Sequence, residues 1–135
     1  MQIGMVGLGR MGGNMARRLL KGGHAVVAYA RGPASVKQLA SEGATGTTAL
    51  DDFVGKLKTP RTAWVMVPAG AATEQVVTDL AARMVPGDTI IDGVNSFYKD
   101  DVRRMKVLKG KGLHYVDVGT SGGVWGLERG YCLMV

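Results

Sequence analysis

The sequence predicts an α/β protein built on a doubly wound, mostly parallel sheet with helices on both faces. Three observations support this. Short apolar runs alternate with longer segments of helical periodicity along the 135 residues. The run at residues 62–67 is strongly apolar, as in a strand covered on both sides. No repeat, low-complexity tract or linker interrupts the alternation. We therefore expect one domain.

The elements follow in order along the chain. Apolar runs predict strands at residues 3–6, 24–29, 62–67, 89–91, 113–118 and 131–135. Apolar side chains at helical spacing predict helices at residues 11–20, 33–42, 73–84 and 98–109. Gly22 and Gly23 are suited to ending the first helix, and Pro33 to beginning the second. Thr48 and Asp51 have the spacing of a capping box, which predicts a further short helix.

Composition excludes several classes of protein. Apolar residues make up 46% and charged residues 21%, which is typical of a globular domain rather than a disordered chain. The 21 glycines follow no Gly-X-Y period, which excludes collagen. The single cysteine, Cys132, excludes an internal disulfide framework. No signal peptide or run of about 20 apolar residues is present, so we expect no membrane partner and a cytoplasmic location.

A glycine fingerprint follows the first predicted strand. The residues that match G-x-G-x-x-G are Gly7, Leu8, Gly9, Arg10, Met11 and Gly12. A strand precedes them and a helix begins within them, which is the context of a dinucleotide-binding Rossmann fold. The first glycine permits a tight turn, the second lets the backbone approach a pyrophosphate, and the third lets the helix pack closely. The free N–H groups of the helix then face the phosphates.

The end of the second strand bears on the choice of cofactor. An acidic residue normally stands there and binds the ribose hydroxyls of NAD. This chain has Ala30, Arg31 and Gly32 instead. Ala30 does not repel a 2′-phosphate, and Arg31 is able to pair with one. The sequence therefore predicts NADP in preference to NAD.

Three more predicted strands end in loops that suit a ligand. The candidate residues are Val67, Pro68 and Ala69 in the first loop, Asn95 in the second, and Ser121, Gly122 and Gly123 in the third. Small residues allow a ring to lie close, Asn95 both donates and accepts, and the last loop offers a hydroxyl and backbone N–H groups. Carboxyl ends of parallel strands meet at one edge, so we expect one site.

These motifs resemble the cofactor-binding domain of decarboxylating 6-phosphogluconate dehydrogenases, within the β-hydroxyacid dehydrogenases. The most specific stretches are DGVNSFYK at residues 92–99 and VGTSGGVWGLERGYCLM at 118–134, and the shorter-chain bacterial form is most similar. The resemblance spans essentially the whole chain. It implies oxidation of 6-phosphogluconate at C3 by hydride transfer to the nicotinamide, then loss of CO2 to give ribulose 5-phosphate.

The resemblance also implies a role for each motif. Residues 7–12 hold the pyrophosphate, 30–32 line the adenosine ribose, and 67–69 contact the cofactor further along. Asn95 meets cofactor and substrate, while Ser121, Gly122 and Gly123 bind the substrate. The catalytic Lys and Glu of the family lie beyond the last motif. We therefore expect residues 1–135 to be a cofactor domain truncated at its C-terminal end, inactive alone, without the helical domain that usually makes the dimer.

One departure and two alternatives remain open. The family has two glycines before Asn-Ser, but here the second is Val94, which tolerates positive φ poorly. A 3-hydroxyisobutyrate-type dehydrogenase is the first alternative, although that type carries an Asp-x-Ser-Thr motif at residues 92–96. The second is a nucleic-acid-binding module, suggested by the net charge of +6 and a basic helix at 98–109. We interpret that helix as a solvated face and expect no nucleic-acid partner.

Overall fold

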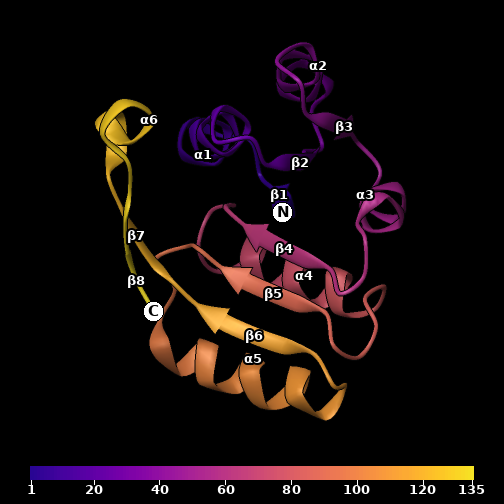
Figure 1. Cartoon of the computed structure of the whole chain (residues 1–135). Helices are drawn as coiled ribbons and strands as arrows, with labels where there is room; N and C mark the ends of the chain where they lie inside the picture. The colour runs from indigo at the N-terminus through magenta and orange to yellow at the C-terminus, as the bar shows by residue number, and fades with distance from the viewer.

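The computed structural model describes all 135 residues, and its main sheet is parallel throughout with the strand order β3-β2-β1-β4-β5-β6 (Figure 1). The strands are β1 (Gln2–Val6), β2 (Ala25–Tyr29), β3 (Thr45–Thr47), β4 (Thr62–Val65), β5 (Thr89–Asp92), β6 (His114–Asp117), β7 (Gly119–Ser121) and β8 (Cys132–Met134). The helices are α1 (Arg10–Lys21), α2 (Pro33–Ser41), α3 (Leu50–Lys56), α4 (Ala71–Ala81), α5 (Tyr98–Gly110) and α6 (Gly126–Arg129). The order reverses between β1 and β4, as in a Rossmann fold.

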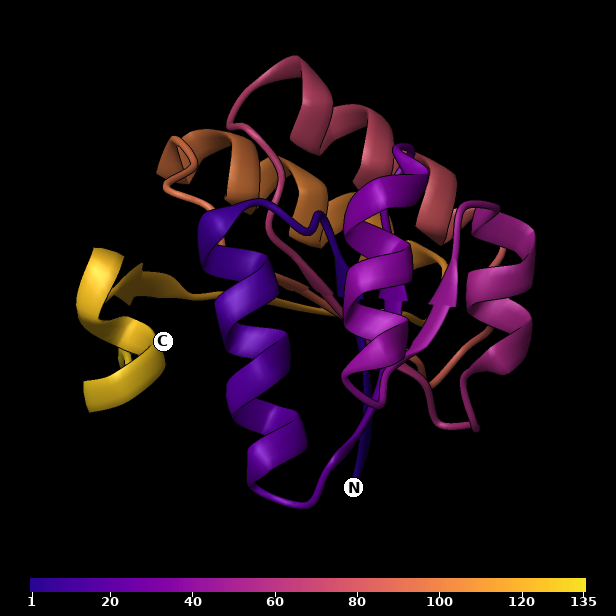
Figure 2. The same ribbon diagram turned by 90° about the horizontal axis from the view of Figure 1, so that it is seen from above.

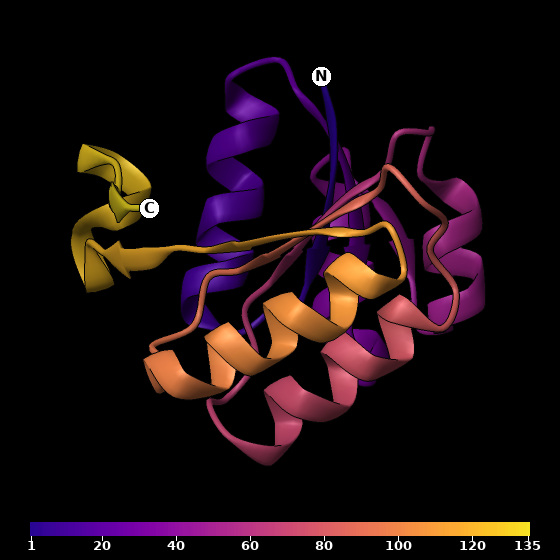
Figure 3. The ribbon, with the colours of Figure 1, turned by 90° about the horizontal axis from the view of Figure 1, so that it is seen from below.

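Helices cover both faces of this sheet, as the sequence predicts. Successive residues of β1 point to opposite faces, so Met5 joins one core and Val6 the other, each fully buried. The core around Met5 includes Met15 of α1 and Leu39 of α2. On the other face α4 and α5 run side by side across the sheet (Figure 3). The α/β class and the doubly wound architecture are confirmed.

The differences from the expected elements are local. Residues 45–47 form an edge strand that the sequence did not indicate, because Thr-Gly-Thr is too short to show a periodicity. The predicted capping box is wrong: α3 begins at Leu50, and the hydroxyl of Thr47, not Thr48, accepts the N–H of Ala49 at 3.1 Å. The fourth helix begins at Ala71, two residues earlier than predicted.

The C-terminal segment leaves the main sheet. β7 and β8 pair antiparallel with each other, in a separate two-stranded sheet. Between them, the 3-10 turn Gly123–Trp125 and α6 lie beside α1 (Figure 2), where Arg18 donates to the carbonyl oxygen of Leu127 at 3.2 Å. None of the helices in the structure has both the length and the apolar character needed to cross a membrane.

Candidate functional site

A cavity of about 480 Å³ opens at the carboxyl edge of the sheet, between the ends of β1 and β4. This is where the strand order reverses, and ligands of doubly wound folds bind at such positions. Seven of the residues predicted for cofactor binding line it: Gly7, Gly9, Ala30, Arg31, Gly32, Val67 and Pro68. Three separate sequence motifs are therefore brought to one cavity of a size suited to part of a dinucleotide.

The glycine fingerprint forms the turn from β1 into α1. Gly7 has a φ of +93°, and a Cβ there would overlap the carbonyl oxygen of Met66. A Cβ on Gly12 would overlap the carbonyl oxygen of Gly7. Gly9 differs, because nothing lies within 4 Å of its Cβ position, so the space beside it is free for a ligand. The first turn of α1 contains no acidic residue that would oppose a phosphate.

The end of β2 places a cation at the cavity. Arg31 is exposed at the cavity and forms no ion pair within the chain, so its guanidinium is free to bind an anion. The sequence reasoning missed the far wall, which α3 and α4 supply. The lining residues on these two helices are Leu50, Ala72, Gln75, Val76 and Asp79. Among them Asp79 is an acid on α4, and it accepts a hydrogen bond from Gln75 Nε2 at 3.0 Å.

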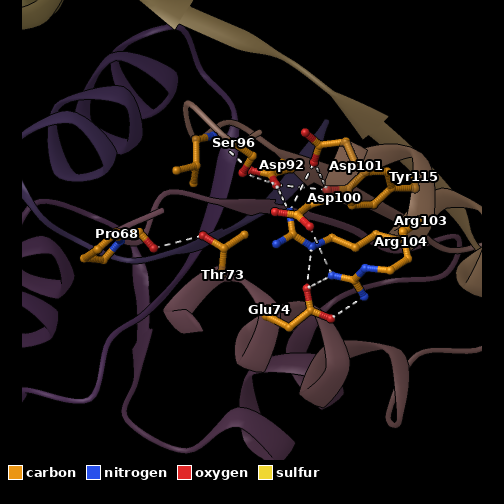
Figure 4. A network of polar contacts seen from close by, with 11 residues as sticks. Pro68, Thr73, Glu74, Asp92, Ser96, Asp100, Asp101, Arg103, Arg104 and Tyr115 are labelled. Carbon is orange, nitrogen blue, oxygen red and sulfur yellow. Dashed lines mark hydrogen bonds and ion pairs between the residues drawn. The ribbon is translucent and has the colours of Figure 1, made fainter. Parts of the chain in front are cut away.

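The Pro68 loop is held by the start of α4. The fully buried Thr73 donates its hydroxyl to the carbonyl oxygen of Pro68 at 2.9 Å (Figure 4). A buried hydroxyl that bonds a loop carbonyl restricts the loop to one conformation. Pro68 is thereby kept at the cavity, whereas its predicted neighbour Ala69 does not line it.

The Asn95 loop is shaped by Asp92, the last residue of β5. The fully buried Asp92 accepts the backbone N–H of Val94 and the hydroxyl of Ser96, each at 2.9 Å. Val94 does not have a positive φ, so the departure from the two-glycine pattern is accommodated without strain. Asn95 itself is exposed and its side chain makes no hydrogen bond within the chain. Its amide is thus available to a ligand.

A charged cluster lies under these two loops. Arg104, only 4% exposed, contacts Glu74, Asp92 and Asp101 (Figure 4). The expectation of a solvated basic face on the helix at residues 98–109 is wrong for this residue. Its spacing from Asp101 and Leu108 matches a buried helical stripe, which is the signal that would have identified it.

Neighbouring charges and burial set the protonation of this cluster. A hydrogen bond from Arg103, with one from Arg104, lowers the pKa of Glu74 to about 2. Burial raises the pKa of Asp101 above its usual range, and the nearby charge of Asp92 adds to that rise. Burial also raises the pKa of the Tyr115 hydroxyl, which faces both Asp92 and Asp101.

The remaining predicted residues lie outside the cavity lining. They are Leu8, Arg10, Met11, Gly12, Ala69, Asn95, Ser121, Gly122 and Gly123. Gly12 is buried in the packing of α1, while Arg10 is exposed at its start. Ser121 ends β7, and Gly122 and Gly123 lead into the 3-10 turn beyond the sheet edge, both with positive φ. Their roles toward a ligand remain predictions.

Comparison with known proteins identifies the family. Residues 2–135 match the family described as the NAD binding domain of 6-phosphogluconate dehydrogenase. The chain belongs to this family of 6-phosphogluconate dehydrogenase domains. It is 39% identical over 135 residues to the NAD(+)-dependent, decarboxylating 6-phosphogluconate dehydrogenase of Haloferax volcanii, covering 100% of this chain and 44% of that protein.

Two solved structures agree with the fold of this dehydrogenase domain. The 6-phosphogluconate dehydrogenase of Plasmodium falciparum, studied with NADP+ and with 6-phosphogluconate, superposes with a TM-score of 0.89 at 29% identity, over 99% of this chain and 30% of that one. The 3-hydroxyisobutyrate dehydrogenase of Mycobacterium tuberculosis gives 0.83 at 26% identity, over 93% and 42%. The chain thus spans less than half the length of each relative. Family membership supports the prediction of a 6-phosphogluconate dehydrogenase domain. The Mycobacterium tuberculosis structure fits the alternative of a 3-hydroxyisobutyrate-type dehydrogenase.

Proposed function

We propose that this chain forms the cofactor half of the active site of a decarboxylating 6-phosphogluconate dehydrogenase that prefers NADP+. The observation that carries the proposal is the cavity at the strand reversal, which Gly9, Arg31 and Pro68 line from three different loops. The free space beside Gly9 and the unpaired guanidinium of Arg31 fit a dinucleotide with a 2′-phosphate. NADP+ held by these loops would supply the hydride acceptor for oxidation of the substrate at C3.

Each loop of the chain has a separate task in this proposal. Residues 7–12 hold the pyrophosphate through backbone N–H groups, and Arg31 pairs with the 2′-phosphate. Val67 and Pro68 support the cofactor further along the cleft. Asn95 donates to cofactor and substrate, and Ser121 with the following glycines binds the carboxylate and hydroxyl end of the substrate. In this proposal the proton of the substrate hydroxyl goes to a Lys base, which the family resemblance places beyond the Ser121 motif.

Calorimetric titration with NADP+ and NAD+ tests the cofactor site. We expect tighter binding of NADP+, and a loss of about tenfold on Arg31→Ala, which is the size of one exposed charge-assisted contact. NAD+ affinity should change less than about twofold. Lys58→Ala removes an equal charge at the opposite, amino edge of the sheet and should change neither affinity. Absence of binding by either dinucleotide would overturn the proposal, and tighter NAD+ binding would overturn the NADP preference.

An activity assay tests whether these 135 residues bind the cofactor without catalysing the reaction. We expect the 135 residues alone to form no NADPH from 6-phosphogluconate, because the family resemblance places the base for the hydroxyl proton beyond the Ser121 motif. Turnover by this chain alone would contradict the proposal. A full-length dehydrogenase that contains this domain should reduce NADP+ faster with 6-phosphogluconate than with 3-hydroxyisobutyrate, and the reverse order would favour the 3-hydroxyisobutyrate type. We further propose that such a dehydrogenase is at least a homodimer and acts in the cytoplasm.

A further inference from the structure

Arg104 joins four elements beneath the candidate site. It lies on α5, and its Nε donates to Oε2 of Glu74 on α4 at 2.8 Å. Its Nη1 lies 3.3 Å from Oδ2 of Asp92 on β5 and 3.2 Å from Oδ1 of Asp101 on its own helix. Tyr115 of β6 completes the cluster. Glu74 also pairs with Arg103, but Arg104 is the cation that pairs with the buried carboxylates of Asp92 and Asp101, which lose their electrostatic compensation when it is removed.

On one side this cluster holds the Asn95 loop. Asp92 uses Oδ1 for the N–H of Val94 and Oδ2 for the hydroxyl of Ser96, the two residues that flank Asn95. The same Oδ2 lies 2.9 Å from the Tyr115 hydroxyl. The orientation of the Asp92 carboxylate therefore sets the loop, and Arg104 and Tyr115 set the orientation of the carboxylate.

On the other side the cluster reaches the Pro68 loop. Glu74 directly follows Thr73 in the first turns of α4, and Thr73 bonds the carbonyl oxygen of Pro68 at 2.9 Å. Fixing Glu74 to Arg104 fixes the start of α4 against α5. Figure 4 shows the network around Arg104, which reaches Ser96 through Asp92, and beside it the separate bond between Thr73 and Pro68, so the link to the Pro68 loop runs through the backbone of α4 from Glu74 to Thr73.

We propose that Arg104 is a positioning residue that fixes the Asn95 loop relative to the Pro68 loop, with Tyr115 as its partner. The inference rests on the proposed function, because it matters only if both loops meet the cofactor. Arg104 does not itself touch the ligand in this scheme. Its effect is to hold Asn95 at one distance and angle from the nicotinamide side of the cleft, so that the loop is ordered before the ligand arrives.

The neighbouring Arg103 provides a matched control. Arg103 also pairs with Glu74, through Nη2 at 2.8 Å, but it is 53% exposed and has no contact with Asp92. Arg103→Met and Arg104→Met remove the same type of side chain from the same carboxylate, with the loss of two hydrogen bonds to Glu74 in the first variant and of one in the second. Only Arg104→Met removes the cation that pairs with Asp92. Differences between the two variants report the link to the Asn95 loop rather than the loss of an ion pair on α4.

The test combines amide hydrogen exchange at Val94 with NADP+ titration of the 135-residue chain. Arg104→Met should reduce the protection of the Val94 amide at least tenfold and weaken NADP+ binding about fivefold, and Arg104→Lys should restore part of both. Arg103→Met should leave both within twofold. Tyr115→Phe removes one hydroxyl from the same carboxylate with little risk to folding, and should loosen Val94 in the same direction.

The outcomes separate this inference from the proposed function. If the unchanged chain binds NADP+ but Arg104→Met and Tyr115→Phe match Arg103→Met in both readouts, the positioning role is overturned and the cofactor site stands. If Arg104→Met does not fold, Tyr115→Phe alone decides, and an unchanged Val94 amide refutes the inference. If the unchanged chain binds neither NADP+ nor NAD+, the proposed function fails and this inference fails with it.

Discussion

Gly9→Ala separates ligand approach from folding more sharply than any other change in the fingerprint. Gly9 has φ −65° and ψ −171°, a conformation that alanine adopts, and nothing lies within 4 Å of its Cβ position. Alanine is the weaker N-cap by up to about 1 kcal/mol. Alanine also lowers the entropy of the unfolded chain, which raises the free energy of unfolding by about 0.4–1 kcal/mol. The melting temperature should therefore move by no more than about 4 °C.

The effect on binding should be much larger. The added methyl group occupies the space through which a pyrophosphate would approach the N–H groups of α1. Losing one or two charge-assisted hydrogen bonds costs about 1.5–3 kcal/mol each, so we expect the Kd for NADP+ to rise at least about tenfold. Calorimetry measures the affinity, and thermal unfolding followed by circular dichroism measures the stability.

Two other glycines serve as controls for this experiment. Gly55 in α3 also has nothing within 4 Å of its Cβ position, so Gly55→Ala should leave binding unchanged and slightly stabilise the helix. In Gly12→Ala the new Cβ overlaps the backbone oxygen of Gly7, so that variant should unfold at a clearly lower temperature. If Gly9→Ala bound NADP+ as tightly as the unchanged chain, with the same melting temperature, the pyrophosphate would not lie where we place it.

Three further changes test the charges of the domain. The pKa of Glu74 is lowered from 4.5 to about 2, so its ionised form contributes stability above about pH 4.5 that is lost as the pH falls toward 2. In urea titrations across pH, the deficit of Glu74→Gln, about 1 kcal/mol after allowance for its partial exposure, should close over that range. Asp79→Asn removes a negative charge from the cavity that Arg31 lines, and should tighten NADP+ binding about two- to fivefold in calorimetry, with less effect on NAD+. Asp88, 1% exposed, accepts the backbone N–H and a guanidinium N–H of Arg61 at the amino edge of the sheet. Asp88→Asn should lower the free energy of unfolding by about 2–4 kcal/mol in urea titrations, and unchanged stability would contradict the role we give this buried carboxylate.

The sequence by itself determined the fold class and the position of the fingerprint. Continuous apolar runs indicated the strands, because a strand that is buried on both faces needs apolar residues along its whole length. Apolar residues at helical spacing indicated the helices between them. Gly7 and Gly12 indicated a tight turn with close packing, and the structure places a backbone oxygen at each Cβ position. The oxygen beside Gly12 belongs to Gly7 and so is local, whereas the oxygen beside Gly7 belongs to the distant Met66. The sequence therefore indicated where glycine is needed but not which backbone crowds Gly7.

Only the tertiary structure decided which distant residues share the site. Gln75 and Asp79 reach the cavity because α4 packs beside β4, a contact that no local pattern encodes. Arg104 appeared in the sequence as one more cation on a basic helix, yet its neighbours from α4, β5 and β6 make it the buried centre of a charged cluster. Burial and pairing of a charge depend on long-range packing, whereas the sequence records only that the charge exists.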